Sequence, residues 1–120
     1  MTIGVGKQTI CELWGARNLD SVEVTERALQ DAVRAAGATL IEVFVHRFAP
    51  HGISGIAVIA ESHLAVHTWP ELGYCAADFF TCGDSVDNDA IVEVLRAAYE
   101  ANHVDVRHFA RGVAPATQPA

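Results

Sequence analysis

The side chains best suited to chemistry gather in one stretch of the chain, residues 52–83. Ser62 carries a hydroxyl that can attack a carbonyl, and Cys82 carries a thiol that can donate a proton. His67 carries an imidazole, which titrates near neutral pH and therefore suits a general base. Taken singly, a strand-end serine bonded to the backbone and a buried small thiol are the commoner interpretations of Ser62 and Cys82. The surrounding sequence must therefore decide between structure and catalysis.

A metal site is one alternative for the histidines of this stretch. His63 and His67 are expected on one face of a strand, two pleats apart, with Cys82 nearby. That spacing is not a standard zinc pattern, and no second cysteine pairs with Cys82. We therefore expect no metal. For His63 alone, a structural role and a role beside Ser62 both stay open.

Bulk properties exclude several classes of protein. The 120 residues are 51% hydrophobic, enough for the core of one small domain, and carry a formal net charge of −7. An acidic chain argues against nucleic acid and anionic membranes as partners, and it suits a small cationic substrate. The three cysteines include no C-x-x-C pair, which fits a reducing cytoplasm better than a disulfide scaffold. Neither a signal-peptide pattern nor an apolar run of about 18 residues is present, so no membrane span is expected.

The hydrophobic pattern predicts six strands and two helices. The strands are expected at residues 8–14, 39–45, 53–60, 63–68, 73–81 and 103–109. One helix is capped by Asp20 or Ser21 and ends near Gly37, and the other is capped by Asp87. Runs of adjacent strands favour antiparallel pairing. The predicted fold is therefore α+β, a two-layer sandwich of an antiparallel sheet covered by two helices.

The strand at residues 53–60 also predicts an association between subunits. Its sequence, ISGIAVIA, is nearly continuous in apolar residues, as in a strand that is buried on both faces. The helices can cover one face only, so a partner subunit is expected on the other, in a homodimer. No boundary divides the rest of the chain. We expect a single domain over residues 1–113 and a flexible tail over residues 114–120.

Three blocks of sequence occur in an order that is specific to one family. They are ESH at residues 61–63, HTWPE at 67–71 and FTCG at 80–83. In this order they resemble the signature of the bacterial S-adenosylmethionine decarboxylase family. The upstream part of the same signature is matched by ELWG at residues 12–15, HRF at 46–48 and GISG at 52–55. The resemblance extends from about Gly6 to Gly112.

The resemblance implies that the chain cuts itself between Glu61 and Ser62. In that family the serine hydroxyl attacks the preceding carbonyl, the peptide becomes an ester, and β-elimination cleaves the chain. The serine is left as a pyruvoyl group, so the expected products are residues 1–61 (the β chain) and 62–120 (the α chain). The pyruvoyl group is the electron sink for decarboxylation. Pyridoxal phosphate, the other common sink, needs a lysine Schiff base, and Lys7 is the only lysine.

The resemblance also implies roles for individual residues in processing and turnover. Ser62 is the pyruvoyl precursor, and the substrate amine would form a Schiff base with the resulting carbonyl. His67 would remove the α-proton of Ser62 during elimination. Ser54 would assist processing through a hydrogen bond. Cys82 would reprotonate the intermediate after carbon dioxide leaves.

The implied substrate is S-adenosylmethionine, and the implied product is the aminopropyl donor for spermidine synthesis. Phe48 matches an aromatic residue that stacks on adenine, and Glu71 matches an acid that binds the ribose hydroxyls. Relatives carry Gly-Arg-His in the first strand, whereas this chain has Gln8 in place of that flat histidine ring. This departure leaves L-ornithine or L-arginine, which lack adenine, as alternative substrates. A non-enzymatic alternative is an uncleaved dimeric binding domain.

Overall fold

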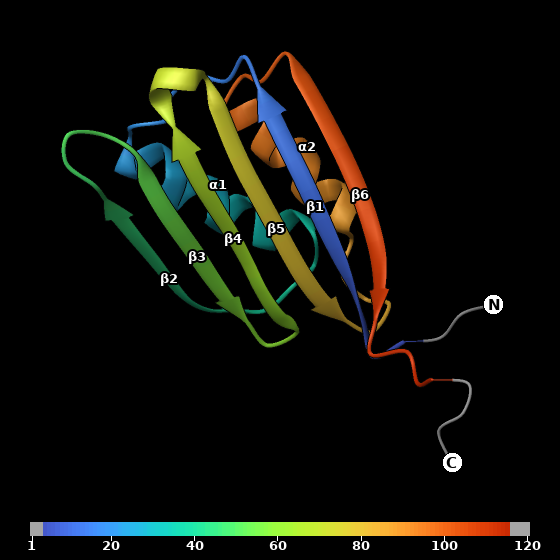
Figure 1. The fold of residues 1–120 in the computed structure, drawn as a ribbon. Coiled ribbons are helices and arrows are strands. Elements are labelled where there is room, and N and C mark those ends of the chain that lie inside the picture. Colours follow the sequence, from blue (N-terminus) through green and yellow to red (C-terminus); the bar gives the residue numbers. More distant parts are fainter. Residues whose placement is uncertain (1–3, 116–120) are drawn as a thin grey trace.

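Residues 4–115, the part of the chain that the computed structural model describes, form six strands and two α-helices in the predicted order (Figure 1). The strands are β1 (Gly6–Trp14), β2 (Leu40–Arg47), β3 (Ile53–Ile59), β4 (Ser62–Trp69), β5 (Tyr74–Cys82) and β6 (His103–Arg111). The helices are α1 (Val22–Ala35), α2 (Asn88–Ala98) and the short 3-10 helix η1 (Pro70–Leu72) between β4 and β5. Most of the predicted tail, residues 116–120, lies outside the described part.

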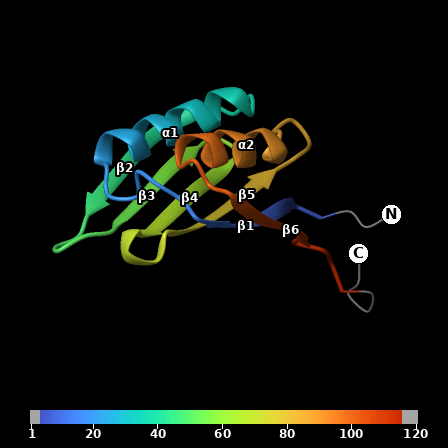
Figure 2. The ribbon, with the colours of Figure 1, turned by 90° about the horizontal axis from the view of Figure 1, so that it is seen from above.

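The strands form one antiparallel sheet in the order β2-β3-β4-β5-β1-β6. β2 to β5 follow one another as neighbours, whereas β1 lies between β5 and β6. Figure 2 shows that both helices cover the same face of this sheet, where α1 packs beside α2. The predicted two-layer α+β sandwich is therefore confirmed.

Side-chain caps determine where the helices begin. Ser21 Oγ accepts a hydrogen bond of 3.1 Å from the amide of Val24, at the start of α1. Asp87 accepts the equivalent bond, also 3.1 Å, at the start of α2. Each cap satisfies a first-turn N–H group that has no partner within the helix. The predicted cap Asp87 is confirmed, and of the two alternatives for α1 it is Ser21, not Asp20, that caps.

Neither helix in residues 4–115 is long and apolar enough to cross a membrane.

The core lies between the helices and the inner face of the sheet. Alternate strand residues point into it, and Leu64 of β4 and Phe79 of β5 have no exposed surface. α1 packs tightly over Gly55 of β3. A Cβ atom at this position would lie 3.0 Å from Thr25 and 3.1 Å from Leu29. A larger residue would therefore push the helix away from the sheet.

The outer face of the sheet is covered by neither helix of the described chain. As expected, the helices of the single chain cover only one face of β3, and burial of its other face by a partner subunit stays a prediction. Ile53 and Ala57 face the helices and are buried, whereas Ile56 and Val58 face outward and are partly exposed. The outer face of β3 is exposed because both helices lie on the opposite face of the sheet (Figure 2). Large apolar side chains of the outer face have exposed fractions of 36–52%: Ile10, Trp14, Phe44, Ile56, Trp69 and Phe109.

Candidate active site

The predicted site residues lie in two groups at opposite ends of β4. The first group, which we call the cleavage end, consists of Glu61, Ser62 and Cys82. The second group, the pocket end, consists of Phe48, Ser54, His67 and Glu71. Because β4 begins at Ser62, and a strand rises about 3.3 Å per residue, His67 lies about 16 Å further along. Within one chain, therefore, Ser62 and His67 are not brought together.

The backbone is strained at the cleavage end. β3 and β4 are joined by a hairpin whose loop is only Ala60 and Glu61. Two-residue hairpin loops usually have a positive φ at their first residue. Neither loop residue has one, and instead Ser62 has a φ of 139°, a conformation that favours glycine. The strain thus lies beside the predicted scissile bond.

Both the side chain and the backbone carbonyl of Glu61 are held. Its carboxylate accepts hydrogen bonds from the Thr39 amide at 3.0 Å and the Thr39 hydroxyl at 3.3 Å. The bond from the Thr39 amide is the main reason why the pKa of Glu61 is lowered. The Glu61 carbonyl accepts a hydrogen bond of 2.9 Å from the amide of Cys82. A donor on this oxygen stabilises the negative charge that develops when a nucleophile attacks the carbonyl.

A histidine contacts the predicted nucleophile directly. Nδ1 of His63 lies 3.4 Å from Ser62 Oγ, and Nε2 of the same ring lies 3.5 Å from Asp78 Oδ2. Gln8 donates a hydrogen bond of 3.3 Å to that carboxylate oxygen. The sequence left the role of His63 open because adjacency along a chain does not reveal where a ring points. Sequence reasoning missed Asp78, because the only feature that could have marked it is that it is an acidic residue within a mostly apolar strand.

A buried polar chain anchors the strand end that carries Cys82. Cys82 is the last residue of β5, and its side chain is exposed. The preceding residue, Thr81, is buried and donates a hydrogen bond of 3.1 Å to Asn88. Asn88, which begins α2, donates in turn to the hydroxyl of Thr9 at 2.8 Å. These bonds fix β5 to α2 and to β1, and so fix the Cys82 amide beside the Glu61 carbonyl.

At the pocket end, the structure brings four predicted site residues around one cavity of about 350 Å³. Ser54 and His67 are direct cross-strand partners on β3 and β4, and Ser54 Oγ lies 2.9 Å from His67 Nδ1. This contact orients the imidazole. Phe48 contributes a half-exposed ring and Glu71 a carboxylate. A flat apolar surface beside a few polar groups is the usual composition of a small-molecule site.

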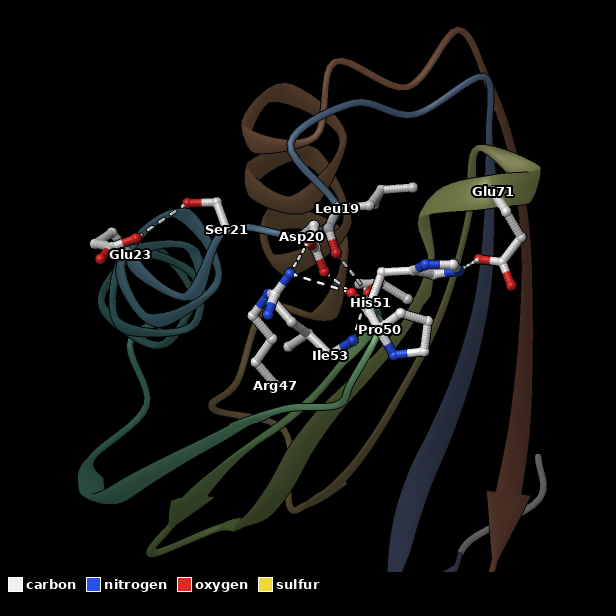
Figure 3. Close-up of polar contacts among 11 residues, drawn as sticks. Leu19, Asp20, Ser21, Glu23, Arg47, Pro50, His51, Ile53 and Glu71 are labelled. Carbon is white, nitrogen blue, oxygen red and sulfur yellow. Dashed lines mark hydrogen bonds and ion pairs between the residues drawn. The ribbon is translucent and has the colours of Figure 1, made fainter.

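The loop that carries Phe48 is clamped to its surroundings, as Figure 3 shows. Asp20 accepts hydrogen bonds from Arg47 at 2.6 Å and from the amide of Gly52 at 2.9 Å. The Arg47 guanidinium lowers the pKa of Asp20. On the other side of the loop, His51 Nε2 lies 3.1 Å from a Glu71 carboxylate oxygen. Asp20, which the sequence offered as a cap for α1, therefore ties the start of this helix to the loop.

The two histidines that could form a metal site do not lie together. His63 contacts Asp78, whereas His67 contacts Ser54 at the other end of β4. In the described part of the chain, no three His, Cys, Asp or Glu side chains gather as ligands for one ion.

Comparison with known proteins identifies the family. The family model described as S-adenosylmethionine decarboxylase matches residues 7–112. The chain belongs to this family. The match runs from β1 to β6, which confirms the resemblance and its extent.

Individual relatives of the S-adenosylmethionine decarboxylase family match over nearly the whole chain. A protein of Thermomicrobium roseum is 46% identical over 110 residues, which is 91% of this chain and 95% of the relative. A protein of Methanococcus maripaludis strain C7 is 46% identical over 111 residues, 91% of each chain. Both are named S-adenosylmethionine decarboxylase proenzyme. The crystal structure of the adenosylmethionine decarboxylase from Aquifex aeolicus VF5 superposes with a TM-score of 0.85, at 28% identity and 98% coverage of both chains.

Proposed function

We propose that this chain is a proenzyme that cleaves itself between Glu61 and Ser62 and then decarboxylates S-adenosylmethionine. The observation that carries the proposal is the geometry of the cleavage end. The Glu61 carbonyl accepts a hydrogen bond from the Cys82 amide, and the next residue, Ser62, is strained. The relatives from Thermomicrobium roseum and Methanococcus maripaludis, which are named as S-adenosylmethionine decarboxylase proenzymes, support the same function.

The proposed cleavage rearranges three bonds. Ser62 Oγ forms a bond to the Glu61 carbonyl carbon, and the peptide C–N bond between the two residues breaks, which leaves an ester. Loss of the Ser62 α-proton then breaks the Cβ–Oγ bond and releases Glu61 as a free carboxylate. Water hydrolyses the remaining unsaturated residue and releases ammonia. The products are residues 1–61 and residues 62–120.

The residues present fit a pyruvoyl cofactor. Ser62 supplies its three carbons, and the exposed Cys82 thiol lies on the neighbouring strand as a proton donor. A pyruvoyl group at position 62 supplies the electron sink that a decarboxylation next to an amine requires. Cys82 would return a proton to the substrate after carbon dioxide leaves.

A complete site requires a second copy of the chain. Ser62 and His67 belong to one reaction but lie at opposite ends of β4. The open outer face, with its exposed large apolar side chains, offers a surface for packing against the same face of a partner. A two-fold axis across the strands reverses their direction in the partner, so the cleavage end of each copy meets the pocket end of the other. We therefore propose a homodimer with two shared sites.

The pocket end supplies the recognition of the substrate. The half-exposed ring of Phe48 would stack on adenine, and the Glu71 carboxylate would accept hydrogen bonds from the ribose hydroxyls. The net charge of −7 suits the cationic sulfonium centre. The three cysteines are free, which agrees with action in the cytoplasm.

Intact mass under denaturing conditions tests the cleavage. The wild-type protein should give two fragments that divide at Glu61/Ser62, with a pyruvoyl group on the second, and Ser62→Ala should give one uncut chain. Ser85→Ala, in an exposed loop beyond Cys82, is the matched control and should be cut like the wild type. A wild-type chain that stays whole would refute the proposal.

The substrate is tested with the cleaved protein and carboxyl-labelled compounds. Release of labelled carbon dioxide is expected from S-adenosylmethionine and not from L-ornithine or L-arginine. Release from L-ornithine or L-arginine alone would agree with the pyruvoyl cofactor but would refute S-adenosylmethionine as the substrate.

A further inference from the structure

We infer that His63, oriented by Asp78, accepts the hydroxyl proton of Ser62 as this serine attacks the Glu61 carbonyl. The inference rests on the proposed self-cleavage and adds a second histidine to it. His63 then acts in the formation of the ester, whereas His67 of the second copy acts in the elimination. The two proton transfers of processing are thereby divided between two residues.

The contacts of the His63 ring carry the inference. Its Nδ1 atom lies 3.4 Å from Ser62 Oγ, and its Nε2 atom lies 3.5 Å from Asp78 Oδ2. A hydrogen on Nε2 that points to the carboxylate leaves the lone pair of Nδ1 facing the hydroxyl. A serine, an imidazole and a carboxylate in this order form the arrangement that activates serine nucleophiles.

The carboxylate of this group is itself held in place. Gln8 on β1 donates a hydrogen bond of 3.3 Å to Asp78 Oδ2, and Arg111 on β6 donates one of 3.0 Å to the Gln8 side-chain oxygen. Residues from two other strands, β1 and β6, thus hold the Asp78 carboxylate beside His63. A surface carboxylate without such support would move freely, so this network favours a positioning role for Asp78.

His67 is poorly placed to be this base in its own chain. It lies about 16 Å along β4 from Ser62, and its Nδ1 atom is engaged by Ser54 at 2.9 Å. His63 touches the serine without any help from a partner. Formation of the ester therefore needs only the chain that is being cut.

The proton that His63 accepts has a defined destination. As Ser62 Oγ bonds to the Glu61 carbon, the oxyanion that forms is stabilised by the Cys82 amide. The C–N bond then breaks, and the protonated imidazole returns its proton to the departing nitrogen of Ser62. The ring ends neutral, and no further reactant is needed.

Hydroxylamine separates the two steps, because it cleaves esters and leaves peptide bonds intact. The test follows freshly translated full-length chains over time by denaturing mass spectrometry, with and without hydroxylamine. His63→Ala should slow cleavage by roughly 100-fold, the lower end for a lost general base, and its uncut chain should resist hydroxylamine. His67→Ala should instead accumulate a chain that hydroxylamine cuts after Glu61.

A matched histidine–carboxylate pair on β6 serves as the control. His103 Nε2 lies 3.2 Å from Asp105 Oδ2, and His103→Ala should be cut at the wild-type rate. Added imidazole should restore part of the cleavage of His63→Ala, which a merely structural defect would not allow. Asp78→Asn should slow the same step, and Asp78→Glu should recover much of the rate.

Three results would overturn the inference while self-cleavage stands: wild-type rates in both His63→Ala and Asp78→Asn, a hydroxylamine-sensitive ester in His63→Ala, or no response to imidazole in a folded His63→Ala protein. A wild-type chain that never cuts itself would overturn the proposed function as well, so the two failures are distinguishable. If His63→Ala does not fold, His63→Gln and Asp78→Asn provide the same readout.

Discussion

Ser62 and His67 lie on the same strand, β4, but at its opposite ends, about 16 Å apart. A site that needs both groups therefore needs one from each of two chains. We predict complementation between variants that are inactive alone. When differently tagged Ser62→Ala and His67→Ala chains are produced together, the His67→Ala chain should be cut, because its own Ser62 meets the intact His67 of its partner.

In a random mixture, about half of the His67→Ala chains should be cut, the share that forms mixed dimers. The control replaces the Ser62→Ala chain by the double variant Ser62→Ala/His67→Ala, which supplies no His67 and should give no cutting. Mass spectrometry of the tagged chains provides the readout. An uncut His67→Ala chain in the first mixture would mean that the site is not shared.

A second prediction concerns the loop that carries Phe48. Asp20→Asn keeps an acceptor for the Gly52 amide but removes the ion pair with Arg47, which measures 2.6 Å. In the cleaved enzyme, KM for S-adenosylmethionine should rise roughly two- to fivefold, the size expected from an exposed ion pair, with kcat unchanged. The control is Asp31→Asn, which breaks a surface pair with Arg34 on α1. An equal change in both variants would argue against the clamp.

Thiol reactivity should distinguish the three cysteines. Cys11 and Cys75 are buried, and burial raises the pKa of each thiol to about 12, from 9.0. At pH 9 both therefore stay protonated in the folded protein, and the thiolate is the reactive form. Iodoacetamide should add one label, at the exposed Cys82, and should abolish decarboxylation. Three labels are expected in denaturant, and a second label in the native protein would contradict the buried assignment.

The buried hydrogen bond between Thr25 of α1 and Tyr99, at the end of α2, predicts an asymmetric effect of mutation. The two oxygen atoms lie 2.7 Å apart, and neither side chain is exposed. Tyr99→Phe leaves the Thr25 hydroxyl buried without this partner and should lower the free energy of unfolding by about 1–3 kcal/mol. Adding Thr25→Val should recover part of the loss, because no unpaired hydroxyl remains.

Urea denaturation at one fixed protein concentration provides the measurement, in a Ser62→Ala background so that the chain stays whole. Equal stabilities for Tyr99→Phe and the wild-type background would show that the bond contributes nothing. A double variant that is less stable than Tyr99→Phe would point to a packing defect instead.

Local sequence patterns determined the secondary structure of this protein and indicated its family. The strands and helices follow from hydrophobic periods of two and 3.6 residues and from capping side chains such as Ser21 and Asp87, which act within a few residues of chain. The order of the blocks around Ser62, His67 and Cys82 indicated the family, because each block is a short continuous run of residues that can be recognised in the sequence. These features need no knowledge of how the strands pair.

Only the tertiary structure decided which of these residues meet. Strand register brings Asp78 to His63, and loop packing brings Asp20 to Gly52, across 32 positions of sequence. The extended conformation of β4 places Ser62 and His67 toward its opposite ends, although only four residues separate them. The physical reason is that an extended strand carries neighbours in sequence far apart, whereas sheet pairing and helix packing, which act between distant segments, bring others into contact.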